Sequence, residues 1–254
     1  MRSWVAESTP IDRAELLNLP PGSFCAGHLR AALEAAGATC RESAADACPR
    51  LTLADDVAAF LKGRESGVRR RLQQAVNAAQ EGTLFTLRRC ETENDAVEAL
   101  DALAQLHQRR WRRLGYPGLF ADRRFRAFQE GVARAFVRNG WLRVTRADAG
   151  TACVAVRLAF AHNGRLYDYL SGFDDTAPAA KRRPGLAILL RQMEEARAEG
   201  IRTIDLLRGD EAYKFELTAE APRNANLVAE LPRATARAFL RRASARSAFA
   251  RFLA

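Results

Sequence analysis

Tyr213 and Lys214 stand out as side chains that could take part in acid–base and anion chemistry. They follow the turn Arg208-Gly209-Asp210-Glu211, close to the carboxyl end of a strand predicted at residues 202–207. A phenol can give a proton to a leaving thiolate, and an ammonium can hold a phosphate or a developing negative charge. In the alternative interpretation, Tyr213 packs against a neighbouring helix and Lys214 is solvated.

Asp205 is a second candidate, because it lies inside an otherwise apolar strand. Its neighbours Ile204 and Leu206 face away from it. A carboxylate that is partly removed from water must be paired, or its pKa rises, which suits a general base. The alternative is that Asp205 ties down the nearby turn through backbone N–H groups, with Arg208 as its partner.

A basic loop supplies a candidate anion site. Lys181, Arg182 and Arg183 come just before a helix that is predicted to begin near Gly185. Cations there oppose the helix dipole unless an anion binds between them and the free N–H groups, and a pyrophosphate fits. The alternative is a solvated basic loop. The absence of a P-loop signature argues against nucleotide hydrolysis.

These residues must be positioned by a strand at residues 165–171, a helix at 186–199 and the strand at 202–207. Parallel strands joined by one helix need a right-handed crossover, which leaves the helix N-terminus at the carboxyl edge of the sheet. Asn163-Gly164 predicts a tight hairpin before the first of these strands, and Gly200 predicts the end of the helix.

Hydrophobic periodicity predicts the remaining elements. We expect helices at residues 65–79, 95–113 and 123–138, and strands at 83–89, 142–146 and 151–161. In the last of these strands, alternation predicts one shared face for Ala152, Val154, Val156, Leu158 and Phe160. Asp55 is expected to cap a helix that runs to Leu61, and His107 and Trp111 are interpreted as core residues.

Composition predicts a soluble globular protein. The chain has 254 residues, 48% of them hydrophobic, and a formal net charge of +10. No apolar run is long enough for membrane insertion and no signal peptide is apparent, so we expect a cytoplasmic protein. Three of the basic residues are lysines and the rest are dispersed arginines, so we do not expect nucleic acid as a partner. Five cysteines without a CxxC pair predict neither disulfides nor a metal site.

Three motifs resemble the GCN5-related N-acetyltransferase (GNAT) superfamily, in particular its cellulose-biosynthesis, CelD-type branch, which is related to the Fem-type aminoacyl transferases. They are the Y-x-Y-x-x-G-F-D run at residues 167–174, the P-G-x-x-L-L-type helix start at 184, and the D-L-L-R-G-D-E-x-Y-K run at 205–214. The family's pyrophosphate loop, Q/R-x-x-G-x-G/A, is replaced by residues 181–187, which contain one glycine.

The resemblance implies an α/β fold with a mixed, mainly antiparallel sheet and a β-α-β crossover that binds CoA. It divides the chain into a remnant of an N-terminal acetyltransferase-like half at residues 1–50, a GNAT-like acyltransferase domain at 51–231, and a C-terminal Arg/Ala-rich helix at 232–254. The implied catalytic residues are Tyr213, Asp205 and Lys214. The implied CoA-binding residues are Leu170, Ser171, Gly172, Lys181, Arg182, Arg183, Gly185 and Leu186.

The resemblance further implies N-acyl transfer from acetyl-CoA, as co-substrate, to the amine of a sugar, polysaccharide precursor or other small molecule, with no metal. Two alternatives stay open. A Fem-like transferase would draw on aminoacyl-tRNA and use the basic surface. A non-catalytic GNAT-like partner in polysaccharide biosynthesis or export would bind neither tRNA nor CoA.

Overall fold

The computed structural model describes residues 13–230, which form two compact units. One unit comprises Pro49–Leu207 and Glu211–Glu220, and the other is built from the described residues up to Cys48, Arg208–Asp210 and those from Ala221 onward. The predicted C-terminal helix at 232–254 lies outside the described residues, as do the first twelve residues of the predicted N-terminal remnant.

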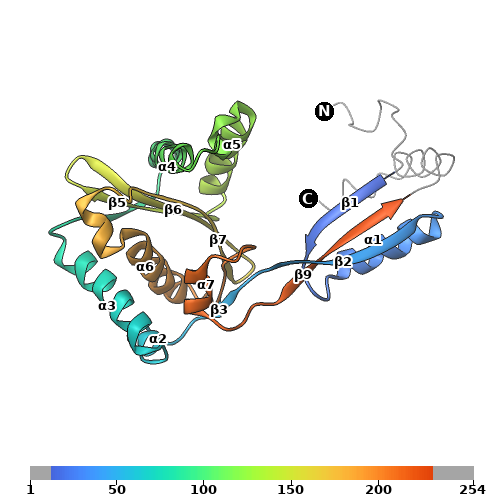
Figure 1. The fold of residues 1–254 in the computed structure, drawn as a ribbon, viewed down its shortest axis with the longest axis horizontal. Coiled ribbons are helices and arrows are strands. Elements are labelled where there is room, and N and C mark those ends of the chain that lie inside the picture. The colour runs from blue at the N-terminus through green and yellow to red at the C-terminus, as the bar shows by residue number, and fades with distance from the viewer. Residues whose placement is uncertain (1–12, 231–254) are drawn as a thin grey trace. The chain divides into compact units, whose positions relative to one another are not determined.

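The larger unit contains a six-stranded sheet in the order β3-β8-β7-β6-β5-β4 (Figure 1). Its elements in chain order are β3 (Arg50–Thr52), α2 (Val57–Lys62), α3 (Ser66–Glu81), β4 (Thr86–Cys90), α4 (Glu93–Arg113), α5 (Arg123–Arg138), β5 (Leu142–Ala149), β6 (Ala152–His162), β7 (Arg165–Phe173), α6 (Pro184–Ala198), β8 (Thr203–Asp205) and α7 (Ala212–Leu217). All neighbouring strands are antiparallel except β7 and β8, which are parallel. The expected mixed, mainly antiparallel sheet flanked by helices is therefore confirmed.

Helices cover both faces of this sheet. Helices α4 and α5 lie on one face, and α3 and α6 lie on the other (Figure 1). Leu100 and Leu103 of α4 pack with Val156 and Leu158 of β6 in one buried cluster, whereas Ile188 of α6 belongs to a second cluster. Burial of these apolar stripes is the main force that fixes α4 and α6 on the sheet.

The hairpin and the crossover form as predicted. Asn163 and Gly164 both have positive φ angles, 48° and 70°, which the tight turn between β6 and β7 requires. Helix α6 connects the parallel strands β7 and β8, and Gly200 follows its end with a φ of 83°. The helix N-terminus thus lies beside the carboxyl end of β7, where a site was expected.

A β-bulge overturns the predicted shared face of β6. Ala147 pairs with Ala155 but the next residue, Asp148, pairs with Cys153, so Val154 is an extra residue in β6. Val154 packs in the cluster of α3 and α6, whereas Val156 packs in the cluster of α4. The extra residue reverses the alternation of side chains across it. A second small correction concerns α2, which is capped by Asp56 and not by Asp55.

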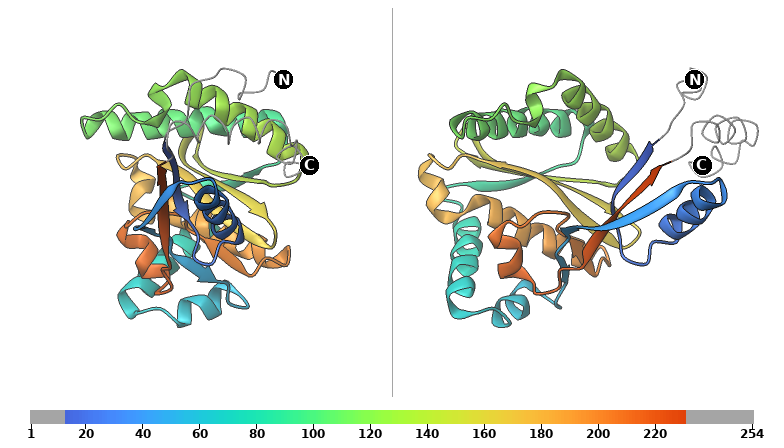
Figure 2. Two further views of the ribbon diagram at one scale, coloured as in Figure 1. Left: turned by 90° about the vertical axis from the view of Figure 1, so that its right-hand side faces the viewer. Right: turned by 45° about the vertical axis from the view of Figure 1, so that its right-hand side comes forward.

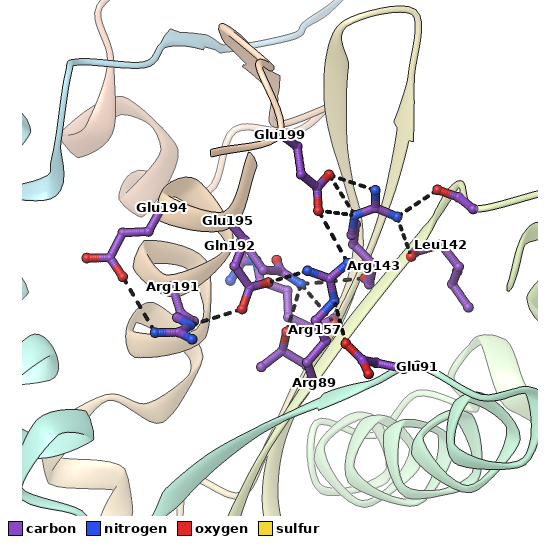
Figure 3. A network of polar contacts seen from close by, with 12 residues as sticks. Arg89, Glu91, Leu142, Arg143, Arg157, Arg191, Gln192, Glu194, Glu195 and Glu199 are labelled. Carbon is purple, nitrogen blue, oxygen red and sulfur yellow. Dashed lines mark hydrogen bonds and ion pairs between the residues drawn. The ribbon is translucent and has the colours of Figure 1, made fainter. Parts of the chain in front are cut away.

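Polar contacts hold the C-terminal half of α6 against β4 and β5 (Figure 3). Arg143 Nη2 lies 2.7 Å from Glu199 Oε2, and Arg89 contacts both Glu195 and Glu199 at 3.5 and 3.3 Å. The buried Gln192 side chain lies 3.4 Å from the carbonyl oxygen of Arg157. These contacts fix the rotation of α6 above the sheet.

The smaller unit is a three-stranded antiparallel sheet with one helix (Figure 2). It consists of β1 (Arg13–Leu19), α1 (Phe24–Ala35), β2 (Thr39–Ala47) and β9 (Arg223–Glu230). The central strand is β9, whose Ala229 packs against Leu33 of α1. The predicted domain limits at residues 50 and 231 stay a prediction, and in the structure β9 shares its sheet with β1 and β2.

Candidate functional site

The parallel strands β7 and β8 pair over only a short length. Their register runs from Arg165 opposite Thr203 to Tyr167 opposite Asp205, where β8 ends, but β7 continues to Phe173. From Asp168 onward, β7 therefore has an edge that β8 does not cover. Backbone N–H and C=O groups along such an edge can bind an extended ligand.

A bulge at Tyr169 shapes this open part of β7. Ala159 of β6 pairs with Asp168 but Leu158 pairs with Leu170, so Tyr169 is the extra residue. Tyr169 and Leu170 both pack with the α4 cluster, and Gln129 of α5 donates a 2.8 Å hydrogen bond to the Tyr169 hydroxyl. The side chains of Asp168 and Ser171 consequently share the opposite face, on which α6 lies.

Arg157 and Asp168 form a buried ion pair on this face. Arg157 of β6 is 3% exposed and Asp168 of β7 is 7% exposed. Arg157 Nε donates to Asp168 Oδ1 at 2.7 Å, and Nη2 donates to Oδ2, so the pair is bidentate. Burial lowers the pKa of the Arg157 guanidinium, but the adjacent carboxylate outweighs burial and raises this pKa above its ordinary value. Arg157 therefore keeps its charge inside the protein.

The same guanidinium reaches two other parts of the candidate site. Arg157 Nη1 donates to the carbonyl oxygen of Gly185 in the first turn of α6 at 3.2 Å, and Nη2 donates to the phenol oxygen of Tyr213 at 3.2 Å. Ser171, which is exposed, lies directly opposite Arg157 in the register of β6 and β7. Arg157 thus joins the open edge of β7, the start of α6 and Tyr213.

Tyr213 is half-buried in α7 with its hydroxyl at this ion pair. Burial raises the pKa of the phenol, and the charges of Asp168 and Glu211 add to this rise, against the opposing charge of Arg157. The phenol is therefore protonated at neutral pH. Because its oxygen accepts a hydrogen bond from Arg157, its own proton remains available for another acceptor.

Asp205 and Lys214 meet at a strained residue where β8 ends. Leu207 has a φ of 55°, a left-handed conformation that is uncommon for leucine. The backbone N–H of Leu207 donates to Asp205 Oδ1 at 2.9 Å, and Lys214 Nζ lies 3.4 Å from its carbonyl oxygen. The two side chains hold the turn that leads into α7.

The partners of these two residues differ from those that the sequence suggested. Asp205 pairs with Arg50 of β3 at 3.3 Å, whereas Arg208 pairs with Asp46 at 3.8 Å. Lys214 is not solvated, as one interpretation held, but is 4% exposed and lies 2.9 Å from Glu211 Oε2. Burial alone would raise the pKa of Glu211, but the hydrogen bond with Lys214 lowers it overall.

The predicted cofactor-binding residues separate into two groups. Lys181, Arg182 and Arg183 are exposed before α6, and Arg183 precedes Pro184 in a left-handed conformation with no side-chain cap. The side chains of Leu170 and Leu186 pack into the core instead. Gly172 lies against α4, where an added Cβ would come within 3.0 Å of Leu103. Gly172 can contact a ligand only through its backbone, and the side chains of Leu170 and Leu186 are partly occupied by the core.

Sequence reasoning missed Arg157 and Asp168. A usable signal existed, because both are charged residues in otherwise apolar strands on either side of the Asn163-Gly164 turn. The turn fixes the register of the hairpin and brings the two residues near each other. His107 is buried between Trp111 and Phe120, with its pKa lowered by burial, which agrees with its interpretation as a core residue. The same interpretation is wrong for Trp111, which is 38% exposed near the end of α4.

Two further properties bear on the class of protein. Among residues 13–230, no cluster of three or more His, Cys, Asp or Glu side chains could hold a metal ion. None of the helices in that range combines the length and the apolar character needed to cross a bilayer.

The mixed sheet with one parallel crossover is the fold of a GNAT-type acetyltransferase domain. The sequence model of the acetyltransferase (GNAT) domain matches residues 66–215, more than half of the chain, so this protein belongs to the GNAT acetyltransferase family. No curated protein matches the chain significantly.

Several solved structures share the fold. The crystal structure of FemX has a TM-score of 0.61 at 10% identity and covers 87% of this chain and 72% of its own. The C-terminal domain of a putative lysylphosphatidylglycerol synthetase from Agrobacterium fabrum has a TM-score of 0.53 at 13% identity, covering 90% of this chain and 71% of its own. A conserved protein of unknown function from Bacteroides thetaiotaomicron has a TM-score of 0.56 at 15% identity, with coverage of 86% and 69%.

Proposed function

We propose that this protein is an acyl-CoA-dependent N-acyltransferase that takes its acyl group, an acetyl group, from acetyl-CoA. The observation that carries this proposal is the separation of β7 and β8 after Tyr167, next to the N-terminus of α6 and to the protonated phenol of Tyr213. The acceptor is an amino group of a sugar, a polysaccharide precursor or another small molecule, as the CelD-type resemblance suggests.

In this proposal the open edge of β7 binds the donor through its backbone. Amide groups of Leu170, Ser171 and Gly172 bind the pantetheine arm, and one of them polarises the thioester carbonyl. Lys181, Arg182 and Arg183 hold the pyrophosphate at the start of α6, where the helix dipole favours an anion. The exposure of these three bases supports this role.

The chemical step is direct attack of the acceptor amine on the thioester. A C–N bond forms as the C–S bond breaks, the amine loses a proton to water, and Tyr213 gives its proton to the departing thiolate. Arg157, held by Asp168, donates a hydrogen bond to the phenol oxygen of Tyr213. The hydroxyl proton of Tyr213 therefore points away from the guanidinium. Asp205 and Lys214 act through the turn at Leu207, which sets the position of α7 and so of Tyr213.

Calorimetric titration with acetyl-CoA tests the proposal. A ligand that binds only the folded protein also raises its thermal midpoint, so both measurements should respond. A flat titration together with an unchanged midpoint at saturating acetyl-CoA would overturn the donor assignment and, with it, the catalytic roles.

A second candidate is a Fem-like transferase that uses aminoacyl-tRNA. It is favoured by one departure from the family's pattern: the loop at residues 181–187 has one glycine, and its Arg183 adopts the left-handed conformation that glycine usually takes. Salt-sensitive binding of tRNA, with no affinity for CoA, would identify this candidate. A non-catalytic partner in polysaccharide biosynthesis or export would bind neither ligand.

A further inference from the structure

The end of α4, its connection to α5 and the start of α5 together carry a high concentration of positive charge. We call residues 108–124 the α4–α5 segment; it contains six arginines and one acidic residue, Asp122. Asp122 is engaged as the cap of α5, where its carboxylate accepts from the backbone N–H of Arg124. The segment is therefore strongly cationic.

The same segment exposes four large apolar or aromatic side chains. Their exposed fractions are 38% for Trp111, 56% for Leu114, 59% for Tyr116 and 51% for Leu119. Scattered exposed leucines are ordinary on a protein surface, but four such side chains within nine residues form a patch. A patch of this kind beside clustered arginines indicates a surface that binds something.

The patch is held in a defined shape. The ring of Trp111 meets that of Tyr116 edge-on at 5.7 Å, and Gln108 Nε2 donates to the carbonyl oxygen of Pro117 at 2.7 Å. Gly115 and Gly118 have φ angles of 83° and 71°, which allow the chain to turn back on α4. Leu114 and Leu119 are thus exposed by a folded loop.

Some arginines of the α4–α5 segment contact other side chains of the protein, and others are exposed. Arg109 and Arg113 pair with Asp174 and Asp175, in the loop after β7, and Arg110 lies over the ring of Phe173 at 4.8 Å. Arg112 and Arg123 are exposed. The ion pairs connect the segment to the end of β7, and the exposed guanidinium groups stay accessible to an external anion.

We propose that the α4–α5 segment docks the protein on an anionic lipid bilayer. Tryptophan and tyrosine favour the membrane–water interface, leucines enter its apolar side, and arginines attract acidic headgroups. A single-stranded nucleic acid fits less well, because bases stack on aromatic rings but leave Leu114 and Leu119 without a partner. The contact is peripheral, and its test does not depend on acyl transfer.

Co-sedimentation with vesicles tests this surface. The protein should bind vesicles made of equal parts phosphatidylcholine and phosphatidylglycerol, and bind pure phosphatidylcholine far less. Leu114→Ser with Leu119→Ser should lower binding about tenfold, and so should Arg112→Glu with Arg123→Glu. Matched controls outside this segment are Leu84→Ser, an exposed leucine before β4, and Arg69→Glu with Arg70→Glu in α3. They should bind like the unchanged protein.

A second measurement uses no variants, so its result does not depend on whether a variant folds. Hydrogen–deuterium exchange on the unchanged protein should show protection of residues 110–120 when the acidic vesicles are added. Absence of binding, equal losses in the control variants, or no protection of this segment would each overturn the proposal. So would binding of a single-stranded oligonucleotide, rather than vesicles, that is lost in the arginine variant.

Discussion

The Nη2 nitrogen of Arg157 lies 3.2 Å from the phenol oxygen of Tyr213 while the same guanidinium is paired with Asp168. The buried guanidinium of Arg157 in β6 therefore connects the antiparallel pair β6 and β7 with helix α7, which follows β8. If Tyr213 is the acid of the reaction, this contact sets which way its hydroxyl points.

Replacing Tyr213 by phenylalanine should separate chemistry from binding. The change keeps the ring and its packing but removes the proton, so turnover should fall about 100-fold with CoA affinity little changed. Tyr169→Phe is the matched control, because Tyr169 is also half-buried and also accepts one hydrogen bond, but from Gln129 on the other face. Full activity in Tyr213→Phe would leave the thiolate to be protonated by water.

The pH dependence of turnover and of stability should reflect the raised pKa of the Tyr213 phenol. Its ordinary value is about 10, so the phenol keeps its proton through neutral and mildly alkaline pH, and any loss of turnover that depends on it should begin above about pH 10. Since the folded pKa is the higher one, the stability from the neutral phenol is fully present below about pH 10 and is lost as pH rises further. Turnover measured against pH checks the first effect, and the free energy of unfolding measured against pH checks the second. Both are measured for the unchanged protein and for Tyr213→Phe. An alkaline limb well below this range would contradict the assignment.

Replacing Arg182 and Arg183 together by alanine should weaken CoA binding by about 1–3 kcal/mol if both donate to phosphate. A pantetheine fragment, which has no pyrophosphate, should lose much less. Arg69 and Arg70, exposed in α3, provide a control pair for the change in net charge. Calorimetry with CoA and its fragments makes the comparison, and equal losses for every fragment would mean that the loop acts on the fold.

Asp168→Asn should be strongly destabilising, because it leaves the Arg157 charge buried without its partner. Removal of one member of a buried pair costs about 3–5 kcal/mol. The matched control is Asp101→Asn, which breaks an exposed pair with Arg126 and should cost less than about 1 kcal/mol. Denaturant unfolding measures both changes. Similar stabilities for the two variants would show that the charge of Arg157 is compensated in another way.

Asp205→Asn distinguishes a positioning residue from a general base. The variant loses the charged contact with Arg50, so the free energy of unfolding should fall by about 1–3 kcal/mol while turnover stays within severalfold of the original. Arg50→Met should have a similar effect on stability, because it removes the other partner. A large loss of turnover in Asp205→Asn with unchanged stability would instead identify Asp205 as the base.

The sequence alone was sufficient for the parts of the fold that local patterns specify. Asn163-Gly164 predicted the hairpin because few residues adopt two successive positive φ angles, and the apolar stripe of α6 with Gly200 predicted the crossover helix. The basic loop before α6 was also visible, since its position depends only on where that helix begins.

Tertiary structure decided what the charged residues inside the larger unit do. The bulge at Tyr169 moves Ser171 onto the face that Arg157 and Asp168 already share, and an extra residue of this kind leaves no clear mark in the alternation of polar and apolar residues. Arg50 became the partner of Asp205 because β3 pairs with β8, more than 150 residues along the chain. Strand partners so far apart are selected by the burial of the whole core, and no local pattern encodes that choice.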